Sequence, residues 1–145
     1  MPKNISVTEA RTLQEAGATY IDVRSSSEYA QGHPAGAVNV PLLEQDEHTG
    51  EMQPNPDFAR VMRANYPADA PLLIGCAVGG RSARAALMLE SFGFREVANV
   101  KGGFSGLRDP FGRVVEPGWA EAGLPVAIEA PPGRRYDDLL AKANG

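Results

Sequence analysis

The sequence reads Pro71-Leu72-Leu73-Ile74-Gly75-Cys76 and continues with Ala77-Val78-Gly79-Gly80-Arg81-Ser82. The first half is a short apolar run between turn residues, which is typical of a strand buried on both faces of a sheet. The second half is a glycine-containing turn that leads into an alanine- and leucine-rich helix, predicted from about residue 81 to 91. A buried strand followed directly by a helix is the repeating unit of parallel α/β sheets.

Short strands and helices alternate on both sides of this stretch. The predicted strands combine β-branched or aromatic residues with flanking turn signals, and they cover residues 19–23, 37–40 and 96–100. The predicted helices cover residues 7–16 and 58–65, with a short one ending near Gly32. This alternation predicts a mostly parallel sheet with helices on both faces.

Helix starts are marked by side chains that can cap them. Ser6 and Ser25 each stand three residues before a glutamate, which is the pattern of a capping box. Asp57 precedes the helix at 58–65, and we expect it to cap that helix. The stretch from 44 to 56 is polar and contains glycine and proline, so we expect a surface loop there.

Composition limits the classes of protein to consider. A chain of 145 residues suits one domain, and its net charge of −4 argues against a general nucleic-acid binder. No apolar run is long enough to span a bilayer, so no membrane partner is expected. The first residues lack the apolar region of a signal peptide, which predicts a cytoplasmic location.

The composition changes near Pro131. From there the chain reads Pro-Pro-Gly-Arg-Arg and continues to a polar end, so we expect residues 131–145 to be a loosely docked tail. The alternative is a terminal helix, because Tyr136, Leu139 and Leu140 would share one helix face.

Cys76 is the only cysteine of the chain. An intramolecular disulfide and a metal site built on several thiolates are therefore excluded, and with only His33 and His48 present we expect no metal. A lone cysteine is often just a small buried apolar residue. The surroundings of Cys76 favour a different interpretation.

Cys76 ends a predicted buried strand, and in open α/β sheets ligands bind at the carboxyl ends of strands. Gly79 and Gly80 allow the following turn to curl so that backbone N–H groups point at one spot, which attracts negative charge. Arg81 adds a fixed cation. Together these features favour a cysteine thiolate, and they predict a nucleophile beside an anion site.

This loop, Cys76 to Ser82, resembles the active-site loop of the rhodanese family. Three other segments resemble the family's early and late motifs: Asp22-Val23-Arg24 with Glu28-Tyr29, Gly32-His33-Pro34-Ala35-Gly36-Ala37-Val38-Asn39-Val40-Pro41, and Gly102-Gly103-Phe104. The resemblance extends from about Ile5 to Val126. It implies an α/β rhodanese-like fold with a central parallel five-stranded sheet and helices on both faces, forming one domain over residues 1–130.

The resemblance also implies roles for individual residues. Cys76 is the nucleophile that carries sulfur as a persulfide without any other cofactor, and Arg81 is the second catalytic residue, which orients an anionic donor. The expected substrate-binding residues are Ala77, Val78, Gly79, Gly80 and Ser82. Asp22 and Arg24 are expected to support the loop, and a purely structural salt bridge between them is an open alternative.

The implied activity is transfer of sulfane sulfur from thiosulfate or a persulfide to cyanide, a small thiol or a protein thiol. One alternative is a protein-specific persulfide carrier or binding module with little turnover of small molecules. A cysteine phosphatase or arsenate reductase of similar fold is less favoured. Those loops place five residues between cysteine and arginine, whereas four separate Cys76 from Arg81 here.

Residues 107–118 depart from the family pattern. They form an insert after the late glycine pair, with Arg108 and Arg113, and we expect a hairpin through Pro110-Phe111-Gly112. Whether the insert borders the site or extends into solvent stays open at this point. We expect Trp119, just beyond it, to be a packing anchor, and His33 to be a structural hydrogen-bonding residue.

Overall fold

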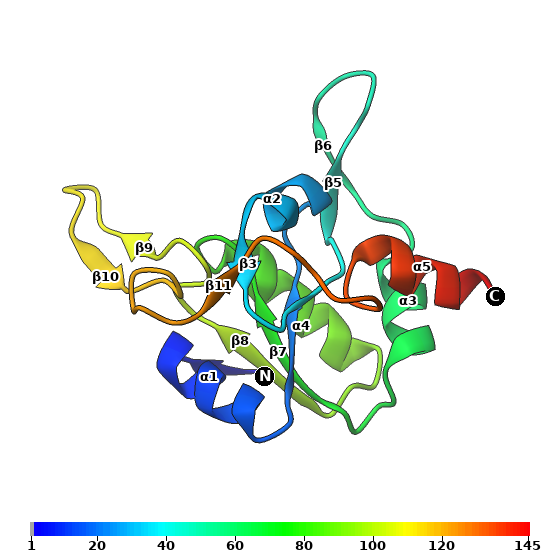
Figure 1. Cartoon of the computed structure of the whole chain (residues 1–145), viewed down its shortest axis with the longest axis horizontal. Helices are drawn as coiled ribbons and strands as arrows, with labels where there is room; N and C mark the ends of the chain where they lie inside the picture. The colour runs from blue at the N-terminus through cyan, green and yellow to red at the C-terminus, as the bar shows by residue number, and fades with distance from the viewer. Residues whose placement is uncertain (1) are drawn as a thin grey trace.

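The computed structural model describes residues 2–145 and places five parallel strands at its centre. The strands stand in the order β1 (Lys3–Ile5), β8 (Glu96–Val100), β7 (Pro71–Gly75), β2 (Thr19–Asp22) and β4 (Val38–Asn39). Every neighbouring pair is parallel, which confirms the predicted sheet. Residues 71–75, the apolar run with which the sequence analysis begins, form the central strand β7 (Figure 1).

Helices cover both faces of the sheet, as predicted. The helices are α1 (Val7–Glu15), α2 (Ser26–Gln31), α3 (Phe58–Asn65), α4 (Gly80–Ser91) and α5 (Tyr136–Asn144). Side chains alternate along β7, so Leu72 and Ile74 pack in one apolar cluster with α3, α4 and α5. Leu73 packs in a second cluster with α1 and α2 on the opposite face.

Two of the three side-chain caps that the sequence predicts at helix N-termini are confirmed. Ser6 and Ser25 both form complete capping boxes, at α1 and α2. The expected cap by Asp57 is wrong, because Asp57 lies at φ −96° and ψ 1° and its side chain makes no capping hydrogen bond. An N-cap residue normally adopts an extended conformation, which aims its oxygen at the first turn. The Asp57 carboxylate instead accepts a hydrogen bond from Arg60 at 3.1 Å.

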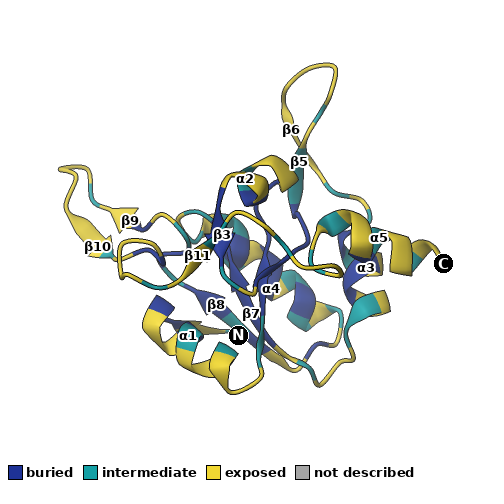
Figure 2. Ribbon diagram, viewed as in Figure 1, coloured by how far each residue is buried: buried dark blue, intermediate teal, exposed yellow. Residues whose placement is uncertain are grey.

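Residues 44–56 lie at the surface, as expected, and they contain more regular structure than a loop. Strands β5 (Leu43–Gln45) and β6 (Met52–Pro54) pair in an antiparallel hairpin that projects from the body (Figure 1). The Asp46 carboxylate accepts the backbone N–H groups of His48 and Thr49, which closes the turn. His48 is exposed on this hairpin, and Figure 2 shows that most of the projection is exposed.

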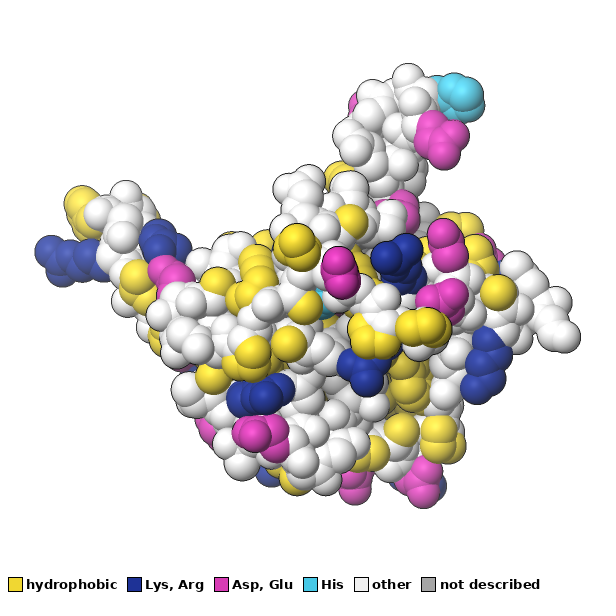
Figure 3. All heavy atoms as spheres, in the orientation of Figure 1, with side chains coloured by type: hydrophobic (Ala, Val, Ile, Leu, Met, Phe, Trp, Pro, Cys, Tyr) yellow, Lys and Arg dark blue, Asp and Glu magenta, His cyan; other side chains and the backbone are white. Residues whose placement is uncertain are grey.

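The insert is the predicted hairpin. Strands β9 (Leu107–Arg108) and β10 (Val114–Glu116) pair antiparallel, and they also project from the body (Figures 1 and 2). Phe111 at the turn is 86% exposed. Figure 3 shows hydrophobic and basic side chains together on this projection.

The expectation of a loosely docked tail is wrong. Residues 136–144 form α5, and Leu139 is only 2% exposed in the cluster shared with α3 and α4. The Asn65 amide donates to the Leu139 carbonyl at 3.1 Å, and Arg60 donates to the Asn144 side chain at 2.8 Å. The apolar face of the helix therefore outweighs the polar composition of the segment.

Two buried side chains take the structural roles expected of them. The His33 ring stacks on Tyr29 with centroids 3.7 Å apart, and its Nδ1 lies 2.7 Å from the Tyr29 carbonyl oxygen. His33 lies in β3 (His33–Pro34), which pairs with β11 (Val126–Ala127). Trp119 is fully buried, and its indole N–H donates to the Pro125 carbonyl at 2.7 Å.

Candidate active site

Cys76 directly follows β7, at the carboxyl edge of the sheet. Asp22 ends the neighbouring strand β2 in register with Gly75, so the two strand ends lie side by side. Cys76 is 1% exposed, whereas Val78, two residues further, is 49% exposed. The loop therefore holds the sulfur below the surface while its own tip faces solvent.

The Cys76 sulfur accepts a hydrogen bond from the backbone N–H of Gly79 at 3.0 Å. Gly79 is the N-cap residue of α4 and has φ +114°, a left-handed conformation that glycine adopts readily. Other backbone N–H groups of the loop have no acceptor within the described part of the chain, namely those of Ala77, Val78, Gly80 and Arg81. Of the expected backbone donors, only the Gly79 N–H therefore binds the Cys76 sulfur, and the other N–H groups can bind a further atom.

A chain of side-chain hydrogen bonds leads away from the sulfur. The Cys76 thiol lies 3.4 Å from the Ser82 hydroxyl, which donates to Asn99 Oδ1 at 2.6 Å. The Asn99 amide nitrogen in turn donates to Asn4 Oδ1 at 2.9 Å. Ser82 is among the site residues expected from the sequence, whereas Asn99 is not. An asparagine between the apolar residues Ala98 and Val100 of the predicted strand was the available signal, because a buried amide requires partners.

The glycine pair after β8 supports the loop from below. Phe104 donates its N–H to the Cys76 carbonyl at 2.8 Å, and Ser105 donates to the Ala77 carbonyl at 2.8 Å. A Cβ atom on Gly103 would lie 2.3 Å from the Cys76 carbonyl oxygen. Only a glycine permits this close approach, so Gly103 and the cysteine loop fit each other as backbone surfaces.

Arg81 makes a two-pronged ion pair with Glu28 of α2. The two nitrogen–oxygen distances are 2.6 and 3.0 Å. The Arg81 guanidinium lowers the pKa of Glu28 to about 2, and Glu28 raises the pKa of Arg81. Arg81 is expected from the sequence to orient an anionic donor, whereas its pairing with Glu28 is not expected. In the structure two of the five guanidinium N–H groups are committed to the carboxylate, and three remain.

Asp22 and Arg24 pair with each other. The Arg24 guanidinium donates to both Asp22 oxygens, and its Nη2 also donates to the Gly32 carbonyl at 2.7 Å. Its guanidinium carbon lies 4.5 Å from the centroid of the Phe104 ring. Both members of the pair are at least 95% buried, so Asp22 and Arg24 form a buried salt bridge next to the residues that hold the cysteine loop.

Comparison with known proteins identifies the family to which this chain belongs. The family model described as "Rhodanese-like domain" matches residues 6–109. The chain belongs to the rhodanese-like domain family.

Relatives of this rhodanese domain carry the name of an enzyme. The chain is 36% identical over 126 residues to thiosulfate sulfurtransferase 16, chloroplastic, of Arabidopsis thaliana, covering 87% of this chain and 93% of the relative. It is 35% identical over 102 residues to the thiosulfate sulfurtransferase GlpE of Pseudomonas fluorescens (strain SBW25), covering 70% of this chain and 81% of the relative.

A solved structure shows the same fold. The crystal structure of Rv0390 from M. tuberculosis superposes with a TM-score of 0.71 at 26% identity, covering 88% of this chain and 98% of the other.

An open cavity of about 370 Å³ lies beside the Glu28–Arg81 pair of the rhodanese domain. It is lined by Arg24, Glu28, Gln31, Gly32, Phe104, Ser105 and Val126. Phe104 and Ser105 are the residues whose N–H groups hold the cysteine loop, so the cavity shares two residues with the support of the loop. Its volume is within the range of small-molecule sites.

Proposed function

We propose that this protein is a sulfurtransferase that moves sulfane sulfur from thiosulfate or a persulfide to a thiophilic acceptor through a Cys76 persulfide. One observation carries the proposal. The only cysteine of the chain stands at the carboxyl edge of a parallel sheet, with one N–H on its sulfur and unsatisfied N–H groups beside it. The names of the relatives at about 35% identity support the same activity.

In the first step the Cys76 thiolate attacks the outer sulfur of thiosulfate. A new S–S bond forms to Cys76, the S–S bond of thiosulfate breaks, and its electron pair leaves with sulfite. The loop N–H groups stabilise the negative charge on the outer sulfur of the persulfide, as an oxyanion hole would. Arg81 orients the dianionic donor with the guanidinium N–H groups that Glu28 leaves free.

In the second step an acceptor removes the outer sulfur and regenerates the thiolate. Cyanide becomes thiocyanate, and a thiol becomes a persulfide. Since the chain contains one cysteine, no internal thiol resolves the intermediate, and the acceptor comes from outside. A two-step covalent route of this kind gives ping-pong kinetics. The cytoplasmic location stays a prediction, and among residues 2–145 no helix has the length and apolar character needed to cross a membrane.

The experiment is an intact-mass measurement on the whole chain after incubation with thiosulfate, before and after cyanide. We expect the wild type to gain one sulfur, to lose it to cyanide and to produce thiocyanate repeatedly. Cys76→Ser is expected to gain none. The conservative variant Arg81→Lys is expected to load sulfur more slowly, because a lysine cannot hold Glu28 and the donor with one planar group.

Other outcomes separate the alternatives. Sulfur loading without turnover of cyanide or small thiols favours a carrier that serves one protein partner. Absence of loading contradicts the proposal, and hydrolysis of a phosphate ester or reduction of arsenate in the same preparation would then favour the related oxyanion enzymes.

A further inference from the structure

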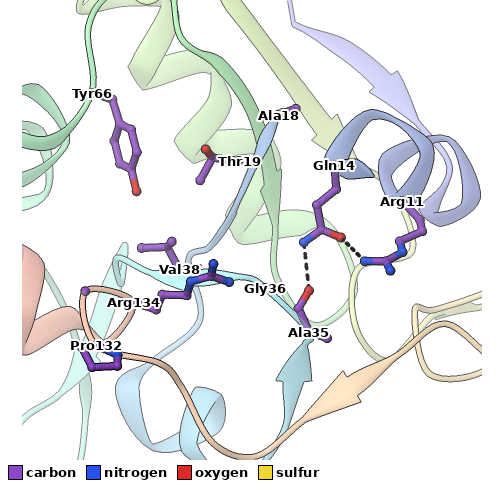
Figure 4. A pocket seen from close by; sticks show the side chains of 11 residues that line it. Arg11, Gln14, Ala18, Thr19, Ala35, Gly36, Val38, Tyr66, Pro132 and Arg134 are labelled. Carbon is purple, nitrogen blue, oxygen red and sulfur yellow. Dashed lines mark hydrogen bonds between the residues drawn. The ribbon is translucent and has the colours of Figure 1, made fainter. Parts of the chain in front are cut away.

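A second cavity lies at the other end of strand β2 from the cysteine loop. It measures about 540 Å³ and is bounded by α1, the start of β2, the turn at 35–36, the end of α3 and residues 132–134 (Figure 4). Thr19 begins β2 at this cavity, whereas Asp22 ends β2 beside Gly75 and the cysteine loop. The proposed sulfur transfer makes no use of this space.

The charge of the cavity is positive. Arg11 and Arg134 are its only charged lining residues, so no carboxylate is among the lining residues of the described chain. Among residues 2–145, Arg134 has no ion-pair partner, and the carboxylate nearest to Arg11 is Glu15 at 3.7 Å. An uncompensated guanidinium in a partly buried hollow is suited to bind carboxylate or phosphate oxygens.

Two hydroxyl groups add neutral donors. Figure 4 shows Tyr66 and Thr19 across the hollow from Arg134, with the Tyr66 hydroxyl directed toward the Arg134 side. Within residues 2–145 neither hydroxyl makes a hydrogen bond to another side chain or to the backbone. Burial raises the pKa of Tyr66 to about 12, so this phenol keeps its proton at neutral pH and can donate it. The nearby Arg134 charge acts in the opposite direction, which shows that the two groups are close enough to interact.

A glycine at position 36 leaves room for the Gln14 and Arg134 side chains to come close together. Gly36 has φ +86°, and a Cβ atom there would lie 3.0 Å from Gln14 Nε2 and 3.3 Å from Arg134 Nη1. Gln14 donates to the Ala35 carbonyl and accepts from Arg11, each at 2.9 Å. The absence of a side chain at position 36 therefore lets groups from two distant segments converge.

We propose that this cavity is a binding site for a small organic anion, one that carries a phosphate monoester or two carboxylates on a short carbon skeleton. Arg134 and Arg11 bind the anionic oxygens, and the Tyr66 and Thr19 hydroxyls donate to the remaining ones. The apolar wall formed by Ala18, Val38 and Pro132 packs against the carbon skeleton.

The test is calorimetric titration of the whole chain with glycerol 3-phosphate, succinate and inorganic phosphate at constant ionic strength. We expect saturable binding of at least one of the two organic anions, tighter than that of inorganic phosphate. Arg134→Gln is expected to weaken binding by about tenfold or more, because a charged hydrogen-bond partner is lost. Arg113→Gln is the matched control, since it removes an arginine from the exposed hairpin, and it is expected to bind as the wild type does.

Further variants keep the result interpretable. Tyr66→Phe removes one hydroxyl without changing charge and is expected to weaken binding by a smaller factor. Cys76→Ser is expected to bind normally, which separates this site from the cysteine loop. The proposal is overturned if neither organic anion binds more tightly than inorganic phosphate, or if Arg134→Gln binds as tightly as Arg113→Gln.

Discussion

Gly103 shows how a single residue without a side chain positions the cysteine loop. Gly103 has φ +55°, and a Cβ atom there would lie 2.3 Å from the Cys76 carbonyl oxygen. Together these two facts exclude any larger residue. The contact is between backbones, so a neighbour cannot relieve a clash by changing rotamer.

The first prediction concerns this contact. We expect Gly103→Ala to displace the loop, separate the Gly79 N–H from the sulfur and reduce the rate of persulfide formation by about tenfold or more, which corresponds to roughly 1.4 kcal/mol or more of lost stabilisation. The measurement is sulfur loading from thiosulfate, followed by intact mass. Gly112→Ala is the matched control, because Gly112 also has a positive φ of +82° yet has no atom within 4 Å of the added carbon. Equal loading in the two variants would show that the contact does not matter.

The second prediction concerns the direction of the hydrogen bonds around Ser82. Its single proton has two acceptors, Asn99 Oδ1 at 2.6 Å and the Gly79 carbonyl oxygen at 3.1 Å, so it is not available to a Cys76 thiolate while the Asn99 amide nitrogen faces Asn4. Rotation of both amides would reverse the chain and free the Ser82 proton for the sulfur. Asn99→Asp cannot reverse, since a carboxylate only accepts.

We therefore expect Asn99→Asp to form the persulfide slowly at neutral pH and to recover as pH rises. The measurement is the pH profile of sulfur loading, together with the ultraviolet absorbance of the thiolate, which reports on a single cysteine in this chain. Asn4→Ala leaves Asn99 free to rotate and is expected to keep the wild-type profile. A wild-type profile in Asn99→Asp would rule out the relay.

At the scale of elements, the Glu28–Arg81 pair joins α2 to the start of α4. Glu28 also completes the capping box of α2, and a glutamine can still serve that function. Glu28→Gln therefore removes the charge and keeps the cap.

The expected pH dependence follows from the lowered pKa of Glu28. Because this pKa falls from 4.5 to about 2 on folding, the ion pair stabilises the native state fully above about pH 5. That contribution decreases as pH falls from 4.5 towards 2. At neutral pH, the wild type should unfold at a higher urea concentration than Glu28→Gln. This difference between the two urea midpoints should vanish near pH 2. A difference that does not change with pH would contradict this account.

The last helix supplies a further prediction. Leu139 is buried between α5 and α3, so Leu139→Ala is expected to cost roughly 2 to 5 kcal/mol of the free energy of unfolding. Leu107→Ala, on the exposed hairpin, is expected to change it by less than about 0.5 kcal/mol. Urea denaturation of both variants is the measurement. A small effect at Leu139 would mean that α5 detaches readily.

The regular elements were predictable because their signals are local. Two capping boxes, the apolar run at 71–75 and the turn at Pro110-Phe111-Gly112 each lie within a few residues. The docking of α5 was missed because it depends on an apolar surface of α3 more than seventy residues away. The Glu28–Arg81 pair and the Ser82–Asn99 contact were missed for the same reason, since each joins side chains that only the folded sheet brings together.

At the scale of the whole molecule, one sheet separates two apolar clusters. Trp119, the only tryptophan, belongs to the cluster under α1 and α2, while most of the helical residues cover the other face. Adjacent residues of β7 contribute to both clusters, so neither cluster can form without that strand.

We expect the chain to unfold in one cooperative transition. Tryptophan fluorescence reports on the first face and far-ultraviolet circular dichroism mainly on the second, so their urea midpoints should coincide. Fluorescence that changes at a lower urea concentration than the circular dichroism would show that the α1 face opens by itself.

The close glycine contacts around Cys76 restrict how this protein can evolve. At Gly75, an added Cβ atom would lie 1.9 Å from the Tyr20 hydroxyl oxygen. At Gly102 it would lie 2.5 Å from the Pro117 carbonyl oxygen, and at Gly103 it would lie 2.3 Å from the Cys76 carbonyl oxygen. Every mutation at these positions adds atoms, because glycine is already the smallest residue, and so none of them has a neutral substitute one step away. Under the proposed function, we therefore expect substitutions that change the choice of sulfur partner at positions with open space, such as the half-exposed Val78 at the tip of the loop.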